Sequence, residues 1–187
     1  MHDIDFISRS KPEIRHVEIV AQSRLFRVER LDLRFSNGRE VQFERLASSS
    51  RGAVLVLPFV DPDTMLLVRE YGAGVDRYEL GFPKGRIEEG ETAATTANRE
   101  IMEEIGYGSR KLTPLKSLSL APGYFSHRTE VILAEELYAA HIPGDEPEDL
   151  EVVPWPVAKF QELLAREDFT EARSIAALYL ATTMIHK

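Results

Sequence analysis

The sequence has 187 residues, 43% of them hydrophobic and 29% charged, a composition typical of an ordinary globular protein. Its net charge of −8 argues against a general nucleic-acid binder, and the absence of cysteine excludes disulfides and thiolate metal sites. It contains no apolar run near the roughly 20 residues that span a bilayer and no signal-peptide pattern at its start, so we expect a cytoplasmic protein without membrane association.

The first part of the chain is predicted to be β structure, because apolar and polar residues alternate along it. The alternation covers residues 17–20, 26–35 and 40–44. Ser36-Asn37-Gly38 supplies the turn of a hairpin between the last two segments. A polar stretch, 47–52, then predicts a linker. We therefore expect an amino-terminal β appendage over residues 1–46 and a main domain over residues 47–187.

The main domain is predicted to combine a sheet with helices, which is typical of the α/β class. The predicted strands are residues 53–58, 64–69, 76–81, 112–120 and 129–136. Apolar residues at spacings near 3.6 predict a helix over 92–105. Two further helices are expected near the end, one opened by Pro156 and running to about residue 166, and one capped by Thr170.

Three glutamates on the helix 92–105 suggest a metal site. Glu100, Glu103 and Glu104 are three or four residues apart, so their side chains share one side of the helix and repel one another. A divalent cation turns that repulsion into coordination, and carboxylate oxygens suit Mg²⁺ or Mn²⁺. The alternative is a solvated acidic face without a chemical role, which is the more common meaning of a charge run.

The residues before this helix are expected to support it. Arg99 lies four residues before Glu103 and eight after Glu91, so it can pair with either. Gly85 and Gly90 flank a loop that is expected to turn tightly. The backbone carbonyl of Lys84 is a further candidate metal ligand, because carbonyl oxygens also suit hard cations.

The complete pattern of these residues resembles the Nudix box, the signature of a family of hydrolases acting on nucleoside diphosphates linked to another moiety. Its fixed residues are Gly85, Glu91, Arg99, Glu100, Glu103, Glu104 and Gly106. Tyr107 departs from the aliphatic residue usual at the end of the box, and we expect it to affect packing only. The segments "LVREYG", "YELGFPKG", "APGYFS" and "FTEARSIAAL" extend the resemblance over nearly the entire chain, toward the ADP-sugar pyrophosphatase branch and its hydrolases of ADP compounds.

The resemblance implies a Nudix α/β/α sandwich with a mixed sheet, and an amino-terminal antiparallel appendage that helps to form a homodimer. It implies hydrolysis, dependent on Mg²⁺ or Mn²⁺, of the diphosphate in ADP-containing compounds such as ADP-ribose, NADH and diadenosine polyphosphates. The products would be AMP and a second phosphorylated fragment. NADH would then be cut as a substrate and would not serve as a redox cofactor.

By the same resemblance, Glu100, Glu103 and Glu104 would hold the cations with the Lys84 carbonyl, while Gly85, Glu91 and Arg99 would be structural. The general base stays open. In this branch a glutamate on a late loop can serve, which points to Glu146 or Glu148, and Glu103 or Glu104 is the competing choice.

Substrate contacts are implied for four further positions. Phe26, Arg45 and Arg69 are candidates for base and phosphate contacts, with core packing or surface charge as the alternative for each. Pro122 follows the box at the distance that marks this branch, and the loop around it would line the substrate site. Gly72 stands where many relatives carry an arginine, which puts one usual ribose or phosphate contact in doubt.

Three rival functions follow from the same residues. One is a hydrolase of another nucleoside diphosphate sugar, such as a GDP-sugar. Another is a catalytically silent nucleotide-sensing regulator, which the intact glutamate set disfavours because a sensor need not keep its metal ligands. The last is an RNA-decapping enzyme, which the acidic balance disfavours.

Overall fold

The computed structural model describes residues 10–47 and 51–185. Residues 1–9 and 48–50, the latter within the predicted linker, lie outside the described residues. The chain forms two compact units, one of residues 1–49 with 121–126 and one of residues 50–120 with 127–187. The predicted boundary after residue 46 and its role in dimerisation stay predictions.

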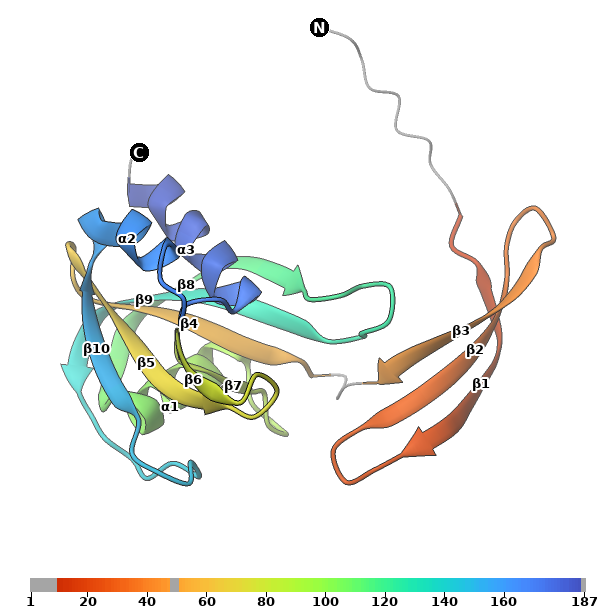
Figure 1. The fold of residues 1–187 in the computed structure, drawn as a ribbon, viewed down its shortest axis with the longest axis horizontal. Coiled ribbons are helices and arrows are strands. Elements are labelled where there is room, and N and C mark those ends of the chain that lie inside the picture. The colour runs from red at the N-terminus through yellow and green to blue at the C-terminus, as the bar shows by residue number, and fades with distance from the viewer. Residues whose placement is uncertain (1–9, 48–50, 186–187) are drawn as a thin grey trace, which may run out of the picture. The chain divides into compact units, whose positions relative to one another are not determined.

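The first unit contains a three-stranded antiparallel sheet (Figure 1). Its strands, in spatial order, are β1 (Glu13–Gln22), β2 (Arg27–Arg34) and β3 (Glu40–Ala47). The predicted hairpin between β2 and β3 is confirmed, and Gly38 at its turn has φ 81°, which favours glycine. The loop 121–126 joins this unit, because the amide of Leu46 donates to the carbonyl of Tyr124 at 2.8 Å.

The second unit contains a seven-stranded mixed sheet, in which β4 and β9 are parallel and the other pairs are antiparallel. Its strands are β4 (Ala53–Asp61), β5 (Thr64–Gly72), β6 (Arg77–Gly81), β7 (Lys84–Arg86), β8 (Tyr107–Ser119), β9 (Arg128–Ala139) and β10 (Glu151–Pro156). The path runs β10-β5-β4-β9-β8, with β6 paired to β5 and β7 paired to β4. The sequence pattern missed β7 and β10.

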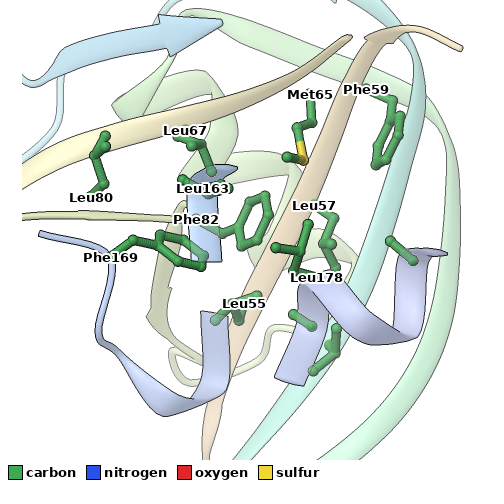
Figure 2. Close-up of a cluster of buried hydrophobic side chains, with 13 residues drawn as sticks. Leu55, Leu57, Phe59, Met65, Leu67, Leu80, Phe82, Leu163, Phe169 and Leu178 are labelled. Atoms are coloured by element: carbon green, nitrogen blue, oxygen red, sulfur yellow. The ribbon is translucent and has the colours of Figure 1, made fainter. Parts of the chain in front are cut away.

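Both faces of this sheet are buried, which is why β4 is a continuous apolar run instead of an alternating one. Leu55 and Leu57 point into the cluster drawn in Figure 2, which Leu163 and Leu178 cover from the carboxyl-terminal helices. Val54 and Val56 point to the opposite face and pack with residues of the box helix. The predicted sandwich is therefore confirmed, with a helical layer on each face of the sheet (Figure 1).

The box helix α1 (Ala93–Glu104) agrees with the predicted span. Thr92 caps its start, since the Thr95 amide donates to the Thr92 hydroxyl at 3.1 Å. Gly106 follows its end with φ 73°, a left-handed conformation that stops a helix. Tyr107 is half-buried and packs against the same apolar cluster as α1, as expected for the departure from the box pattern.

The carboxyl-terminal helices are shorter or capped differently than predicted. After Pro156 the chain forms a 3₁₀ turn, η1 (Val157–Lys159), and the short helix α2 (Phe160–Leu164). The last helix is α3 (Ala172–Ile185). The predicted cap at Thr170 is wrong: the Glu171 carboxylate accepts the Ser174 amide at 2.7 Å, and the Thr170 hydroxyl binds Glu79 instead.

None of the helices within residues 10–47 and 51–185 combines the length and the apolar character needed to cross a membrane.

Candidate active site

The structure buries two of the three α1 glutamates against the neighbouring strand β7. Glu100 and Glu104 are only 6% and 8% exposed. A Cβ atom added to Gly85 would lie 1.8 Å from Oε1 of Glu100. Gly85, at the centre of β7, is thus needed because the carboxylate lies directly against the backbone. The tight turn predicted in the loop between Gly85 and Gly90 is confirmed, since residues 89 and 90 form a turn. Gly90 has φ 84° in this turn.

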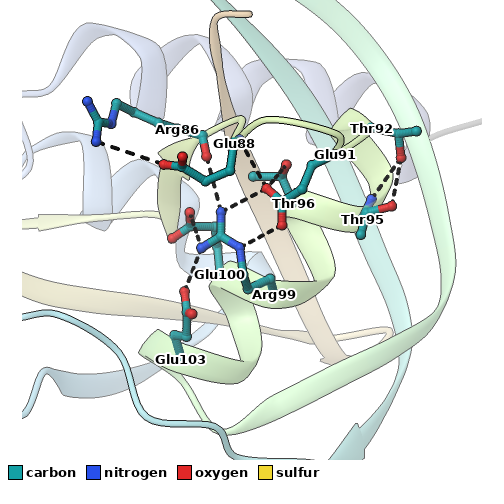
Figure 3. A network of polar contacts seen from close by, with 9 residues as sticks. All are labelled: Arg86, Glu88, Glu91, Thr92, Thr95, Thr96, Arg99, Glu100 and Glu103. Atoms are coloured by element: carbon teal, nitrogen blue, oxygen red, sulfur yellow. Dashed lines mark hydrogen bonds and ion pairs between the residues drawn. The ribbon is translucent and has the colours of Figure 1, made fainter.

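Arg99 ties the loop before the helix to the helix itself, as Figure 3 shows. Its Nε donates to Glu91 at 2.9 Å, and its Nη1 lies 2.8 Å from Glu103 and 2.9 Å from Glu100. Arg99 therefore pairs with Glu91 and Glu103 at once, where the sequence left one or the other open. The hydrogen bonds from Arg99, joined by one from Thr96, lower the pKa of Glu91 to about 2.

The carboxylate of Glu104 has fewer stabilising hydrogen bonds than that of Glu91. Its Oε1 accepts the backbone amide of Lys84 at 3.3 Å, but its buried Oε2 has no hydrogen-bond partner among the residues that the structure describes. Burial raises the pKa of Glu104 to about 8 and that of Glu100 to about 7, against the opposing effects of nearby Lys84 and Arg99. Two neighbouring carboxyl groups are consequently held where their ionised forms are poorly stabilised by the protein alone.

These residues fit a divalent cation. Carboxylate oxygens are the ligands that Mg²⁺ and Mn²⁺ prefer, and the unpartnered Oε2 of Glu104 is a buried acceptor with unused lone pairs. Glu100 and Glu103 form ion pairs with Arg99. Within the described residues, no three acidic or histidine side chains are arranged as metal ligands. The roles of Glu100, Glu103, Glu104 and the Lys84 carbonyl as ligands therefore stay predictions.

A hollow of about 560 Å³, here called the acidic hollow, lies between the end of α1 and a late loop. Its lining includes Glu103 and Glu104 on one side and Glu146 and Glu148 on the other. The late loop carries the acidic segment Gly144–Asp149. The structure thus brings the predicted late-loop glutamates to the same site as the α1 glutamates, although the sequence separates them by some forty positions.

A second hollow, of about 580 Å³, is lined by Lys84, whose amide binds the buried Glu104. It is here called the hairpin hollow, because β5, β6 and their connecting turn line it together with the start of α3. Lys84 links the two regions: its amide binds Glu104, while its ammonium group pairs with Glu70 at 2.5 Å inside this hollow. Tyr71 and Arg173 also line it.

The sequence pattern pointed to Gly72 and Lys84 but missed the other residues of the hairpin hollow. Glu70 and Tyr71 lie within "LVREYG" and Arg173 within "FTEARSIAAL", so the quoted segments did contain them. Nothing in the spacing indicated that these segments meet, because they come together only when α3 packs against β4 of the sheet.

The predicted substrate-binding residues lie in different surroundings. Phe26 is 60% exposed, Arg45 forms hydrogen bonds with Glu29 at 2.8 and 3.0 Å, and both belong to the first unit with Pro122. Arg69 lines neither the acidic nor the hairpin hollow. Its guanidinium group is held by Glu151 at 2.8 Å and Asp168 at 2.6 Å.

This geometry can be compared with known proteins. Residues 12–45 match the NudE-type Nudix hydrolase N-terminal domain, and residues 49–178 match the NUDIX domain. The chain is 50% identical to the ADP compounds hydrolase NudE of Escherichia coli K12 over 173 residues, which cover 92% of each chain. It is 30% identical to the ADP-ribose pyrophosphatase of Bacillus subtilis 168 over 149 residues, 79% of this chain and 80% of that one.

A solved structure described as an ADP compounds hydrolase has the same fold. It superposes with a TM-score of 0.89 at 48% sequence identity, and the match covers 97% of both chains. The similarity therefore includes the amino-terminal sheet as well as the larger unit.

Proposed function

This chain belongs to the Nudix family and is a pyrophosphohydrolase, and from that premise we propose that it hydrolyses the diphosphate linkage of ADP-containing compounds. ADP-ribose, NADH and diadenosine polyphosphates are the proposed substrates. Water adds to one phosphorus, the bond from that phosphorus to the bridging oxygen breaks, and AMP leaves with a second phosphorylated product. The names of the two relatives above support the choice of ADP compounds.

The observation that carries the proposal is the pair of buried carboxyl groups, Glu100 and Glu104, whose charges the protein does not fully compensate. A buried charge that the protein compensates only in part is costly, and it persists where function requires it. Glu100, Glu103 and Glu104 would hold Mg²⁺ or Mn²⁺ with the Lys84 carbonyl. When bound, the cation neutralises the diphosphate and lowers the pKa of the attacking water.

We assign the general base to Glu146. Glu148 accepts a hydrogen bond from the Tyr78 hydroxyl at 2.7 Å, whereas the Glu146 carboxylate has no hydrogen-bond partner in the part of the chain that the structure describes. Glu146 is therefore free to accept the proton that the attacking water loses. Glu103 is engaged by Arg99, and Glu104 is needed as a ligand in this scheme.

Product analysis tests the proposal. The purified chain would be incubated with Mg²⁺ or Mn²⁺ and, separately, ADP-ribose, NADH, diadenosine tetraphosphate and GDP-mannose, and the products separated by ion-exchange chromatography. We expect AMP from the first three. Preferential cleavage of GDP-mannose would favour another nucleotide preference, and tight ADP-ribose binding without AMP release would favour a sensor. A cytoplasmic location stays a prediction.

We also propose that the amino-terminal sheet forms a homodimer. β1 is the edge strand of its sheet and is exposed along its whole length. Ile14, Val17 and Ile19 are 54%, 45% and 52% exposed, although such apolar edge strands are usually covered. Light scattering of the intact chain and of a chain lacking residues 1–46 should give a dimer and a monomer, and the truncated chain should bind substrate poorly. A fully active monomer would refute this arrangement.

A further inference from the structure

The acidic segment Gly144–Asp149 is held in place at few points. Before it, the Ala140 amide donates to the carbonyl of Gly106 at 3.0 Å and the Ile142 amide to that of Met102 at 3.4 Å, which fastens the chain to the end of α1. After it, β10 pairs with β5 from Glu151 onward. Between these anchors, the described backbone of residues 143–149 forms no hydrogen bond with other backbone.

The acidic segment also lies near other negatively charged side chains, those of α1. A Cβ atom added to Gly144 would lie 2.0 Å from Oε2 of Glu146 and 3.5 Å from Cβ of Glu103, so the Glu146 side chain folds back beside the α1 glutamates. Like charges repel, and the repulsion grows as they come closer. Charge alone would therefore move the segment away from α1, and a contact of another kind is needed to keep it there.

The Tyr78 hydroxyl provides that contact by donating to Oε1 of Glu148 at 2.7 Å. Within the residues that the structure describes, no other side-chain hydrogen bond joins the acidic segment to the rest of the chain. A neutral donor bound to an ionised carboxylate forms a strong hydrogen bond and adds no charge that would compete with the cation site.

Tyr78 is itself firmly positioned. It lies on β6 opposite Tyr71 of β5, and the two rings meet edge to face with their centroids 5.6 Å apart. Farther along β6, Leu80 is buried and its amide donates to the Asp168 carbonyl at 2.6 Å. The hydroxyl is thus presented by a paired strand, while the segment that it holds has no regular structure.

We propose that Tyr78 is a positioning residue of this hydrolase: by holding Glu148, it keeps Glu146 opposite the carboxylates of α1. The inference rests on the proposed function, since it concerns the geometry of that reaction. Glu148 then serves as the anchor of the acidic segment and Glu146 as its reactive group.

A double-mutant cycle tests the inference. Tyr78→Phe keeps the ring and its contact with Tyr71 but removes the donor, and Glu148→Ala removes the acceptor. With ADP-ribose and Mg²⁺, each change is expected to lower kcat by roughly ten- to hundredfold, because a misplaced catalytic group costs about that much, while KM changes less. The double variant should be no slower than either single one, since both remove the same hydrogen bond.

Two further variants distinguish a positioning role of Tyr78 from an unspecific loss of activity. Glu148→Gln keeps a carbonyl oxygen that can accept from Tyr78, and it should retain most of the activity that Glu148→Ala loses. Tyr179→Phe removes an exposed hydroxyl on α3, outside both hollows, and is the matched control. Hydrogen exchange of residues 143–149 should rise in Tyr78→Phe and stay unchanged in Tyr179→Phe.

The outcomes distinguish this inference from the proposed function. Wild-type kcat in Tyr78→Phe, additive losses in the cycle, or unchanged hydrogen exchange of residues 143–149 would each overturn the positioning role alone. An intact chain that released no AMP from ADP-ribose would overturn the proposed function, and the positioning role with it.

Discussion

Glu91 and Glu104 belong to the same acidic stretch, yet their carboxyl groups have opposite environments. Glu91 accepts hydrogen bonds from Thr96 at 2.8 Å and Arg99 at 2.9 Å, and these contacts lower its pKa to about 2. Glu104 accepts one hydrogen bond, from the Lys84 amide, and its other oxygen has no partner in the described part of the chain. Burial raises the pKa of Glu104 to about 8.

The difference between these two glutamates indicates how structural and ligand-binding carboxylates can be told apart. A structural carboxylate obtains its counter-charge from the protein, so its ionised form stabilises the fold. A ligand-binding carboxylate is held where the ionised form is costly until a cation arrives. Glu91 is of the first kind and Glu104 of the second, and three experiments test that distinction.

Replacing Glu104 should give the largest effect, which is a loss of catalytic activity. Glu104→Gln is expected to lower kcat about a thousandfold, since several kcal/mol of charge stabilisation correspond to about that factor. The free energy of unfolding without cation should not fall more than about 1 kcal/mol below that of wild type, because the change removes a poorly compensated charge. Both quantities follow from initial rates and urea unfolding.

The matched control for this experiment is Glu89→Gln, which removes an exposed carboxylate from the loop before α1. It should leave both quantities unchanged. An unaltered kcat in Glu104→Gln would remove Glu104 from the metal site and would place both glutamates in the structural class.

Replacing Arg99 should give a smaller effect, which is a loss of folding stability. The ammonium group of a lysine in Arg99→Lys cannot replace the planar guanidinium group, which pairs with Glu91, Glu100 and Glu103 at the same time. The free energy of unfolding is expected to fall by about 2 kcal/mol, the typical value of hydrogen bonds to charged groups, as measured by urea unfolding. Arg86→Lys is the control, because Arg86 is exposed and lies 3.8 Å from Glu88. Equal stability of the two variants would contradict the structural role of Arg99.

The pH dependence of stability should show the smallest effect over a single pH unit, a change of about 1 kcal/mol in the free energy of unfolding. The pKa of Glu104 is raised by folding, so the folded state binds more protons than the unfolded state between pH 4.5 and about 8, and stability falls as pH rises through that window. The pKa of Glu91 is lowered, so its contribution is present above pH 4.5 and is lost as pH falls toward about 2.

Urea unfolding in a chelating buffer measures this dependence. Glu104→Gln should flatten the decline toward pH 8, Glu91→Gln should flatten the acid limb, and Mn²⁺ should restore stability at pH 8 in the wild-type chain only. Identical pH profiles for the two variants would show that the two carboxyl groups do not differ in the way described.

Much of the site was predictable, because its spacing is local. A helix places residues three and four positions apart on one side, so the proximity of Glu100, Glu103 and Glu104 followed from the sequence, as did a pairing of Arg99 with this group. The span of α1 was also predictable, because its start and end carry local signals in Thr92 and Gly106.

Other elements were missed because distant partners stabilise them. β10 contains Pro154 and Pro156, which local propensity disfavours in a strand, but it forms because it can pair with β5 at the edge of the sheet. Arg69 stays a predicted substrate contact, and its pairing with Glu151 and Asp168 could not be predicted, because both partners are far away in the sequence. These outcomes depend on which strands become neighbours, which no local pattern specifies.

The sequence by itself determined the family, the box helix and the side of that helix on which the glutamates lie, because each depends on residue types at fixed spacings. The tertiary structure decided which carboxylates are compensated, how closely Glu100 approaches Gly85, and that Tyr78 meets Glu148. Burial and long-range partners arise only when separate elements pack together, and these two properties set the charge state of a buried carboxyl group.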